Sequence, residues 1–189
     1  AKRWKPQFKV SVNLSPFNLR DPSFVASVER ILKDTGLQPS RLILELTEGS
    51  VMEWSDAVRD RLSRLRAIGV ELWIDDFGAG YSNFVYLQHL SCNVIKIDRS
   101  FLSQYGKRRE LLAGMIAFAR TCGLRVAVEG VETAEHHDLL VELGCELLQG
   151  FLLARPLPPD QIRTLFGLDL PFHSGAPIAP ALGRDKIAS

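Results

Sequence analysis

Short apolar runs that each end in a polar side chain with metal- or phosphate-binding chemistry recur along the whole chain. Their polar ends are Asn13, Glu45, the pair Asp75 and Asp76, Lys96, Glu129 and Gln149. One carboxylate after one strand carries little information, because loops are polar in general. If the strands run parallel in one closed sheet, however, their carboxyl ends meet at one mouth, where α/β-barrel enzymes have their active sites. The pattern therefore indicates a metal-dependent enzyme, or a relative that has lost its activity.

Helical patterns separate these runs. The expected strands are 8–14, 42–46, 70–74, 93–97, 124–128 and 146–148. The expected helices, with their flanking residues, are 21–36, 55–69, 84–90, 111–123 and 133–143. Asp21, Ser55 and Thr133 are the expected N-caps, and glycine ends most of these helices. Strands rich in Val, Ile and Leu that alternate with helices are typical of a parallel sheet covered by helices.

The fold class that follows is α/β, and the spread of polar strand ends favours a TIM-like barrel. An open doubly wound sheet is the alternative, but it would gather function at one switch point instead of at every strand. A complete eight-stranded barrel needs about 250 residues, and this chain of 189 shows about six β/α units. We therefore expect an incomplete barrel over residues 1–165 and a flexible tail or linker over residues 166–189.

The composition excludes several classes of protein. The formal net charge is +1, so there is no bulk electrostatic reason to expect a nucleic acid polymer as partner. The apolar runs are too short to span a membrane, and no signal-peptide pattern opens the chain. Three cysteines without a Cys-x-x-Cys pair are typical of free thiols in a reducing compartment. We expect a cytoplasmic domain without membrane contact, although a longer parent protein could be membrane-anchored.

The acidic positions differ in how strongly they indicate function. Glu45 lies between apolar neighbours, where a charge is expensive unless it is paired or bound to metal. Asp75 and Asp76 are adjacent and cannot both face the same way on a regular strand, but two hard oxygen ligands suit divalent cations. A helix N-cap followed by a turn is the alternative for this pair. Asn13 taken alone is better explained as a turn residue than as a ligand, and Glu48 could simply be a solvated acid in a loop.

Lys96 lies near the end of a buried strand, where a lysine needs a partner. Asp98 is a candidate partner, and a role for Lys96 in orienting water or neutralising phosphate follows from its charge. Glu129 repeats the pattern, whereas Glu132 could instead cap the next helix. Gln149 by itself is only a weak indication of function.

The remaining motifs exclude other chemistries. The Phe-Gly-Ala-Gly-Tyr-Ser segment at 77–82 lacks the third glycine of a dinucleotide loop and the Gly-Lys-Ser of a P-loop, so we expect a loop beside the site. His136, His137 and the basic run 107–109 are expected at the solvated surface, the run just before a helix. No nucleophile elbow or catalytic Cys/His pair is evident. An oxygen-rich site with one lysine indicates hydrolysis of a phosphate ester assisted by Mg²⁺ or Mn²⁺.

These motifs, in this order, resemble the EAL-domain family of bacterial cyclic di-GMP phosphodiesterases. The matching segments are Val-Asn-Leu-Ser, Glu-Leu-Thr-Glu, Asp-Asp-Phe-Gly-Ala-Gly-Tyr-Ser, Lys-Ile-Asp, Glu-Gly-Val-Glu and Gln-Gly-Phe, within residues 8–160. The resemblance implies a modified (β/α)8 barrel for bacterial signalling. It also implies that two cations hold a phosphodiester of cyclic di-GMP while water opens the ring to linear pGpG.

The resemblance also implies a role for each matched residue. Asn13, Glu45 and Asp75 would bind one metal, and Asp75 and Asp76 would serve the second. Lys96 would hold or activate the attacking water, and Glu129 would be a further acid at the metals. Glu48 would anchor the regulatory loop 77–83, which contains Phe77, Gly78, Gly80 and Ser82. Asp98, Glu132 and Gln149 would be further supporting residues.

The chain departs from the family pattern mainly at its start. The Glu-Ala-Leu-x-Arg segment, with a metal-binding Glu and a phosphate-binding Arg, is absent, and the chain begins with Ala1, as a piece of a larger protein would. Ala79 and Asn83 replace the usual Thr and Ser, and the segment between Lys96 and Leu111 is short, which puts family-type dimerisation in doubt. We expect little activity from the 189 residues alone, and a homodimer or a swapped oligomer.

The intact parent protein, to which a GGDEF or sensor domain could be fused, is expected to hydrolyse cyclic di-GMP. The alternative is a degenerate domain that acts as a cyclic di-GMP receptor or a protein-interaction module.

Overall fold

The structure is a computed structural model, and it describes residues 8–51, 55–79, 92–103, 105–158 and 161–162. The chain divides into two compact units, residues 1–156 and 157–189. The expected division after residue 165 stays a prediction. The architecture below is that of the first unit.

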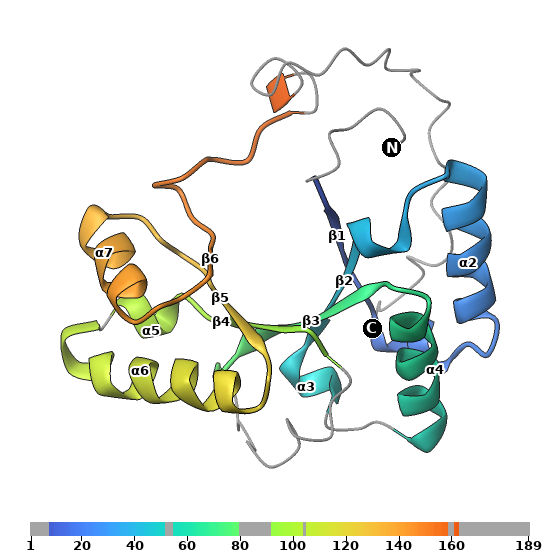
Figure 1. The fold of residues 1–189 in the computed structure, drawn as a ribbon, viewed down its shortest axis with the longest axis horizontal. Helices are drawn as coiled ribbons and strands as arrows, with labels where there is room; N and C mark the ends of the chain where they lie inside the picture. The colour runs from blue at the N-terminus through green and yellow to red at the C-terminus, as the bar shows by residue number, and fades with distance from the viewer. Residues whose placement is uncertain (1–7, 52–54, 80–91, 104, 159–160, 163–189) are drawn as a thin grey trace, which may run out of the picture. The chain divides into compact units, whose positions relative to one another are not determined.

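The described strands form one parallel sheet whose order follows the chain. The strands are β1 (Val10–Asn13), β2 (Leu42–Thr47), β3 (Glu71–Phe77), β4 (Val94–Ile97), β5 (Arg125–Val128) and β6 (Leu147–Leu148), and the sheet order is β1-β2-β3-β4-β5-β6 (Figure 1). A doubly wound sheet would reverse direction at a switch point. This order has no reversal, so the sheet is an incomplete TIM-like barrel, and the α/β prediction is confirmed.

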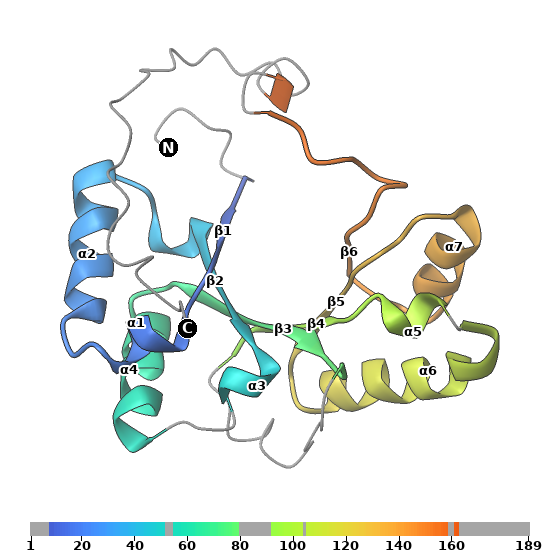
Figure 2. The ribbon, with the colours of Figure 1, turned by 180° about the vertical axis from the view of Figure 1, so that it is seen from behind.

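Helices connect and cover the strands. They are α1 (Pro16–Arg20), α2 (Phe24–Thr35), the 3₁₀ helix η1 (Pro39–Arg41), α3 (Glu48–Val51), α4 (Asp56–Ala67), α5 (Ser100–Ser103), α6 (Tyr105–Thr121) and α7 (Ala134–Glu142). In both views α2 and α4 flank β1 to β3, whereas α5, α6 and α7 flank β4 to β6 (Figures 1 and 2). The expected helix 84–90 lies outside the described residues. No helix of the described chain is long and apolar enough to cross a bilayer.

Helix α2 shows how local sequence sets these boundaries. Its buried residues Val25, Val28 and Leu32 recur at helical spacing and lie on one face. Gly36 ends the helix with φ 65°, a left-handed conformation that glycine adopts without a Cβ clash. Asp21, however, is not the N-cap. Ser23 takes that position, and the Asp21 carboxylate accepts a hydrogen bond from the Ser23 N–H at 2.8 Å.

Two other helix starts differ in how they are capped. Thr133 caps α7, and its Oγ1 accepts a hydrogen bond from the His136 N–H at 3.2 Å. Ser55 precedes α4, but its side chain makes no capping hydrogen bond. Helix α6 begins at Tyr105, so the basic run 107–109 lies inside a helix and not before one. Poor helix signals in the first turn of α6 explain this error.

The core lies between the sheet and its helices. On β2, Leu44 and Leu46 belong to this core and are 4% and 0% exposed. Because side chains alternate along a strand, Glu45 between them faces the opposite, concave side. The same alternation on β4 buries Ile95 and Ile97 in the core and places Lys96 on the concave side. The sheet therefore separates an apolar layer from a polar one.

Candidate active site

The ends of β2, β3, β4 and β5 bring three carboxylates to one ammonium group. The Lys96 Nζ lies 3.4 Å from Oε1 of Glu45, 2.9 Å from Oδ1 of Asp75 and 2.5 Å from Oε1 of Glu129. All four residues were predicted as site residues from their positions in the sequence. They are far apart in the chain, and the parallel register of the sheet makes them neighbours.

Lys96 is the electrostatic centre of this group. Burial alone would lower the pKa of Lys96, but hydrogen bonds to Glu129 and Asp75 and the charges of Asp75 and Glu45 raise it above the ordinary value. The side chain is therefore a permanent cation that donates hydrogen bonds. Asp98, which the sequence suggested as its partner, is not one of these contacts. The Asp98 carboxylate instead accepts a hydrogen bond from the Ser100 N–H at 2.9 Å.

A β-bulge explains how two adjacent aspartates serve one site. Between Ile74 and Phe77 the register of β3 against β4 shifts, so that Asp75 and Asp76 together lie opposite Lys96. Asp76 has φ 56°, in the left-handed region that non-glycine residues rarely adopt. In this conformation a carboxylate oxygen of Asp76 lies within 4.8 Å of one of Asp75. The helix N-cap alternative for the pair is wrong, because both residues belong to a strand.

Carboxylate oxygens of Asp75, Asp76 and Glu129 all lie within 4.8 Å of one another. Such a cluster of hard oxygen atoms suits Mg²⁺ or Mn²⁺. Burial and the charges of Asp75 and Asp98 raise the pKa of Asp76, while Lys96 opposes this effect. Three negative groups held this close are costly without a positive charge, so the donor set fits a divalent cation.

The supporting residue Glu48 connects the site to the segment that follows β3. Its side chain is 5% exposed, and Oε2 accepts a hydrogen bond from the Gly78 N–H at 2.9 Å. Phe77 is fully buried, and Gly78 has φ 90°. This contact is the one expected of an anchoring residue, but the regulatory role of the loop stays a prediction. Gly80 and Ser82 lie outside the described residues.

Asn13 and Gln149 lie at the two sides of this group. Asn13 is the last residue of β1 and pairs in register with Glu45 on β2. Gln149 directly follows β6, and its backbone N–H donates to Val128 O at 2.9 Å. Both side chains are exposed, and their functional roles stay predictions.

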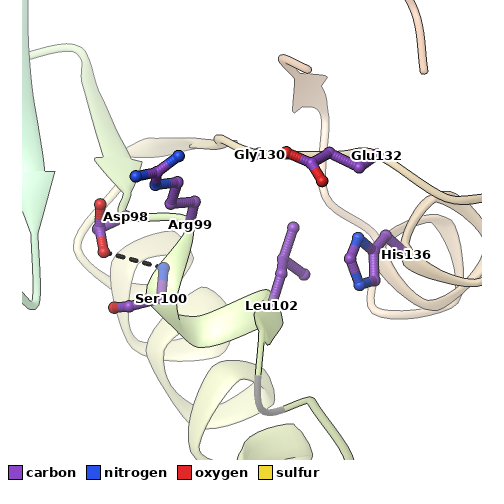
Figure 3. Close-up of a pocket in the computed structure, with 7 residues that line it drawn as sticks. All are labelled: Asp98, Arg99, Ser100, Leu102, Gly130, Glu132 and His136. Carbon is purple, nitrogen blue, oxygen red and sulfur yellow. Dashed lines mark hydrogen bonds between the residues drawn. The ribbon is translucent and has the colours of Figure 1, made fainter. Parts of the chain in front are cut away.

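A cavity of about 620 Å³ adjoins the site. It is lined by Asp98, Arg99, Ser100, Leu102, Gly130, Glu132 and His136 (Figure 3). The residues that follow β4 and β5 form much of its wall; Lys96 belongs to β4, and Glu129 directly follows β5. The Leu102, Glu132 and His136 side chains point toward its interior (Figure 3). His136 was expected at the solvated surface, but it is only partly exposed.

The sequence pointed to Asp98 and Glu132 but missed the other residues of this cavity. Arg99 is exposed and, among the described lining residues, carries the only guanidinium. Its position three residues after Lys96 was the available signal. Glu132 does not cap α7, because Thr133 does.

The chain belongs to the EAL domain family, whose model matches residues 1–156. The bifunctional diguanylate cyclase/cyclic di-GMP phosphodiesterase MucR of Pseudomonas aeruginosa is 40% identical over 158 residues, which are 82% of this chain and 23% of MucR. The cyclic di-GMP phosphodiesterase NbdA of the same organism is 41% identical over 155 residues, which are 80% of this chain and 20% of NbdA. The chain thus spans less than a quarter of either relative.

Solved structures of EAL proteins have the same fold. A cyclic di-GMP complex of the PaMucR phosphodiesterase has a TM-score of 0.75 at 41% identity, over 82% of this chain and 64% of that one. The EAL domain of Mycobacterium smegmatis DcpA has a TM-score of 0.79 at 37% identity, over 84% and 72%. A manganese/cyclic di-GMP complex of Klebsiella pneumoniae BlrP1 has a TM-score of 0.74 at 34% identity, over 80% and 40%. The family resemblance seen in the sequence is confirmed.

Proposed function

We propose that the protein containing this chain hydrolyses cyclic di-GMP to linear pGpG with two divalent cations. The observation that carries the proposal is the convergence of Asp75, Asp76 and Glu129 oxygens within 4.8 Å beside Lys96. Relatives named as cyclic di-GMP phosphodiesterases support the substrate. A complex of BlrP1 with manganese and the nucleotide supports the use of a divalent cation.

The metal ligands in this proposal are Asn13, Glu45, Asp75, Asp76 and Glu129. Mg²⁺ or Mn²⁺ bound by them would neutralise charge on the phosphodiester and lower the pKa of water. Asp75 and Asp76 would both offer oxygen ligands to the cations, because the bulge places both residues opposite Lys96 and their carboxylate oxygens lie within 4.8 Å of each other.

Lys96 has a different role in the proposal. Because its pKa is raised, the ammonium group donates hydrogen bonds and cannot act as a general base at neutral pH. We assign it to holding the attacking water and to balancing negative charge as the phosphodiester reacts. Glu129, which lies 2.5 Å from Lys96 Nζ, fixes the direction of that group.

The cavity beside the site is proposed to receive one guanine base of the dinucleotide. A guanine edge offers acceptors at O6 and N7 to an arginine, and its N1–H and N2–H₂ donate to a carboxylate. Arg99 and Glu132 provide these two kinds of group in one cavity. The volume of about 620 Å³ is within the range of small-molecule sites.

Conversion of cyclic di-GMP to pGpG by the longer protein tests this function. We expect Glu45→Ala and Lys96→Ala to reduce turnover by several powers of ten, each worth about 1.4 kcal/mol of barrier. Glu142→Gln is a matched control, because Glu142 forms an exposed ion pair with Arg109 on the helices. Equal turnover by the parent and the two site variants would contradict the assignment.

The same protein can separate the enzyme from a receptor. Calorimetry with cyclic di-GMP in EDTA should detect weak binding or none if the cations hold the phosphodiester. Tight binding in EDTA without any turnover in Mg²⁺ or Mn²⁺ would instead identify a receptor domain.

A further inference from the structure

A second charged cluster lies on the concave side of the sheet, at the opposite end of the strands from the site. Glu71 accepts hydrogen bonds from Lys9 Nζ, from an Arg125 guanidinium nitrogen at 2.9 Å and from Trp73 Nε1 at 3.0 Å. The Glu71 side chain is 15% exposed. We call these four residues the Glu71 cluster. Its members were not among the predicted site residues.

The Glu71 cluster connects strands that are not neighbours. Glu71 begins β3, Arg125 begins β5, and Lys9 directly precedes β1. In the sheet order, β2 lies between β1 and β3, and β4 lies between β3 and β5. The ion pairs therefore reach across the concave side and span five strands.

The same three strands carry site residues at their other ends, at a constant spacing. Asn13 follows Lys9 by four residues, Asp75 follows Glu71 by four, and Glu129 follows Arg125 by four. Residues four apart on a strand share a face and lie about 13 Å apart. The three charged residues of the Glu71 cluster are thus each paired with one site residue along the same strand segment, and the two residues of each pair lie on the same side of the sheet.

The register shows that the Glu71 cluster and the candidate site are staggered across the strands in the same way. The register aligns Trp73 on β3 with Val94 on β4, and Val94 with Arg125 on β5. Glu71 therefore lies two residues before the position on β3 that is aligned with Arg125. At the bulge, Asp75 lies opposite Lys96, and Lys96 is aligned with Ala127 on β5. Asp75 is therefore level with Ala127, two residues before Glu129.

Curvature of the sheet is the property that such a cluster can control. Backbone hydrogen bonds fix the register of neighbouring strands, which lie about 4.8 Å apart. These hydrogen bonds do not fix the distance between side chains on alternate strands. On the concave side, that distance becomes shorter as the sheet curves more strongly. Asp75 and Glu129 belong to alternate strands, so the separation of their carboxylates depends on this curvature.

We propose that Glu71 is a positioning residue, and that its ion pairs with Lys9 and Arg125 set the curvature that brings Asp75 and Glu129 together. The inference rests on the metal site of the proposed function. Glu71 touches neither the metal ligands nor Lys96 in any described contact. It acts through the strands that carry them.

Binding of Mn²⁺ by the longer protein that contains this chain, measured by titration calorimetry without nucleotide, tests the proposal. Glu71→Gln keeps the size of the side chain but removes its charge, and we expect it to weaken Mn²⁺ binding about tenfold, as loss of a supporting contact commonly does. Arg125→Lys keeps a cation and should retain most of the affinity. Glu142→Gln, which breaks the exposed pair with Arg109, should change nothing. Circular dichroism at the same temperature reports the folded fraction of every variant.

The outcomes separate this proposal from the proposed function. If the longer parent protein binds Mn²⁺ and its Glu71→Gln variant binds it equally well while folded, the positioning role is wrong. If the parent binds no Mn²⁺, the metal site of the proposed function fails, and hydrogen exchange then tests positioning directly. The Glu129 N–H, which donates to Ile97 O at 3.1 Å, should exchange faster in Glu71→Gln than in Glu142→Gln. Equal exchange rates would overturn the proposal.

Discussion

The Lys96 Nζ lies 2.5 Å from Oε1 of Glu129, which directly follows the neighbouring strand β5, and the same ammonium group also pairs with Asp75 and Glu45. One cation thus compensates three carboxylates where the strands end. The Lys96 side chain is 4% exposed, so water contributes little to this balance. The acidic groups are therefore held close together by the protein itself.

Replacing Lys96 by methionine should destabilise the chain most when no metal is present. The three carboxylates would lose their shared cation, and breaking a buried pair in this way commonly costs about 3 kcal/mol or more. Mn²⁺ should restore a large part of the loss, because it supplies positive charge at the same oxygens. Urea unfolding in EDTA and in Mn²⁺ measures both effects. Lys33→Met on the exposed face of α2 is the control and should be neutral. An unchanged free energy of unfolding for Lys96→Met in EDTA would contradict the prediction.

Asp76 combines backbone strain with charge repulsion, and variants can separate them. Asp76→Gly should raise the free energy of unfolding by about 1 kcal/mol or more, because glycine accepts φ 56° without strain. Asp76→Asn keeps the strain but removes the repulsion from Asp75 and Asp98 that raises the Asp76 pKa. Its gain should be smaller. Both variants should bind Mn²⁺ more weakly than the parent. A destabilised Asp76→Gly would show that the conformation carries no strain.

Gly78 has both a backbone and a packing reason to be glycine. Its φ is 90°, and an added Cβ would lie 2.7 Å from the Phe101 ring. Gly78→Ala should therefore cost about 2 kcal/mol or more in denaturant unfolding. Gly114→Ala is a suitable control, because nothing lies within 4 Å of its Cβ position in helix α6. That variant should stabilise the chain by up to about 1 kcal/mol. Equal effects of the two substitutions would refute the packing argument.

The order of the strands and most of the site could be predicted from the sequence. Glu45 and Lys96 stand out because each is a charge within an apolar strand, and a local pattern reveals such a conflict. The bulge at Asp75 and Asp76 could not be predicted, since it depends on how β3 pairs with β4. Asp98 was a wrong partner for Lys96, because the chain turns after Ile97 and directs that carboxylate to a backbone N–H.

The Glu71 cluster shows the same limit at longer range. A glutamate at the start of a strand is unremarkable by itself, and nothing nearby in the sequence marks it. Its partners Lys9 and Arg125 are 62 and 54 residues away. Only the closing curvature of the sheet brings them together. The short helices α1 and α5 were also missed, because each is too brief to show a helical period.

Acid should remove the stabilising contribution of Glu71. Burial opposes ionisation of Glu71, but hydrogen bonds from Lys9 and Trp73 and the charges of Lys9 and Arg125 outweigh it, so the pKa lies below its usual value. A carboxyl whose pKa is lower in the folded state stabilises that state fully above its unfolded pKa of about 4.3, and loses the contribution as the pH falls through the folded value. Unfolding measured from pH 6 to pH 3 should show a shallower pH dependence for Glu71→Gln. Identical slopes for the variant and the parent would contradict the lowered pKa.

The cavity beside the site should discriminate guanine from adenine if Arg99 and Glu132 read the base. Glu132→Gln removes an acceptor for N1–H and N2–H₂, and we expect it to weaken binding of cyclic di-GMP about tenfold. The affinity for cyclic di-AMP, which lacks these donors, should change little. The ratio of the affinity for cyclic di-GMP to that for cyclic di-AMP should therefore fall. Arg99→Ala should act in the same direction through O6 and N7. Glu135→Gln, on an exposed residue outside the cavity lining, is the matched control. Calorimetry of the longer protein and its three variants with each nucleotide in Ca²⁺ measures these affinities, and BlrP1 has been observed with cyclic di-GMP and calcium. Equal losses for the two nucleotides, or none for either, would exclude base recognition by this cavity.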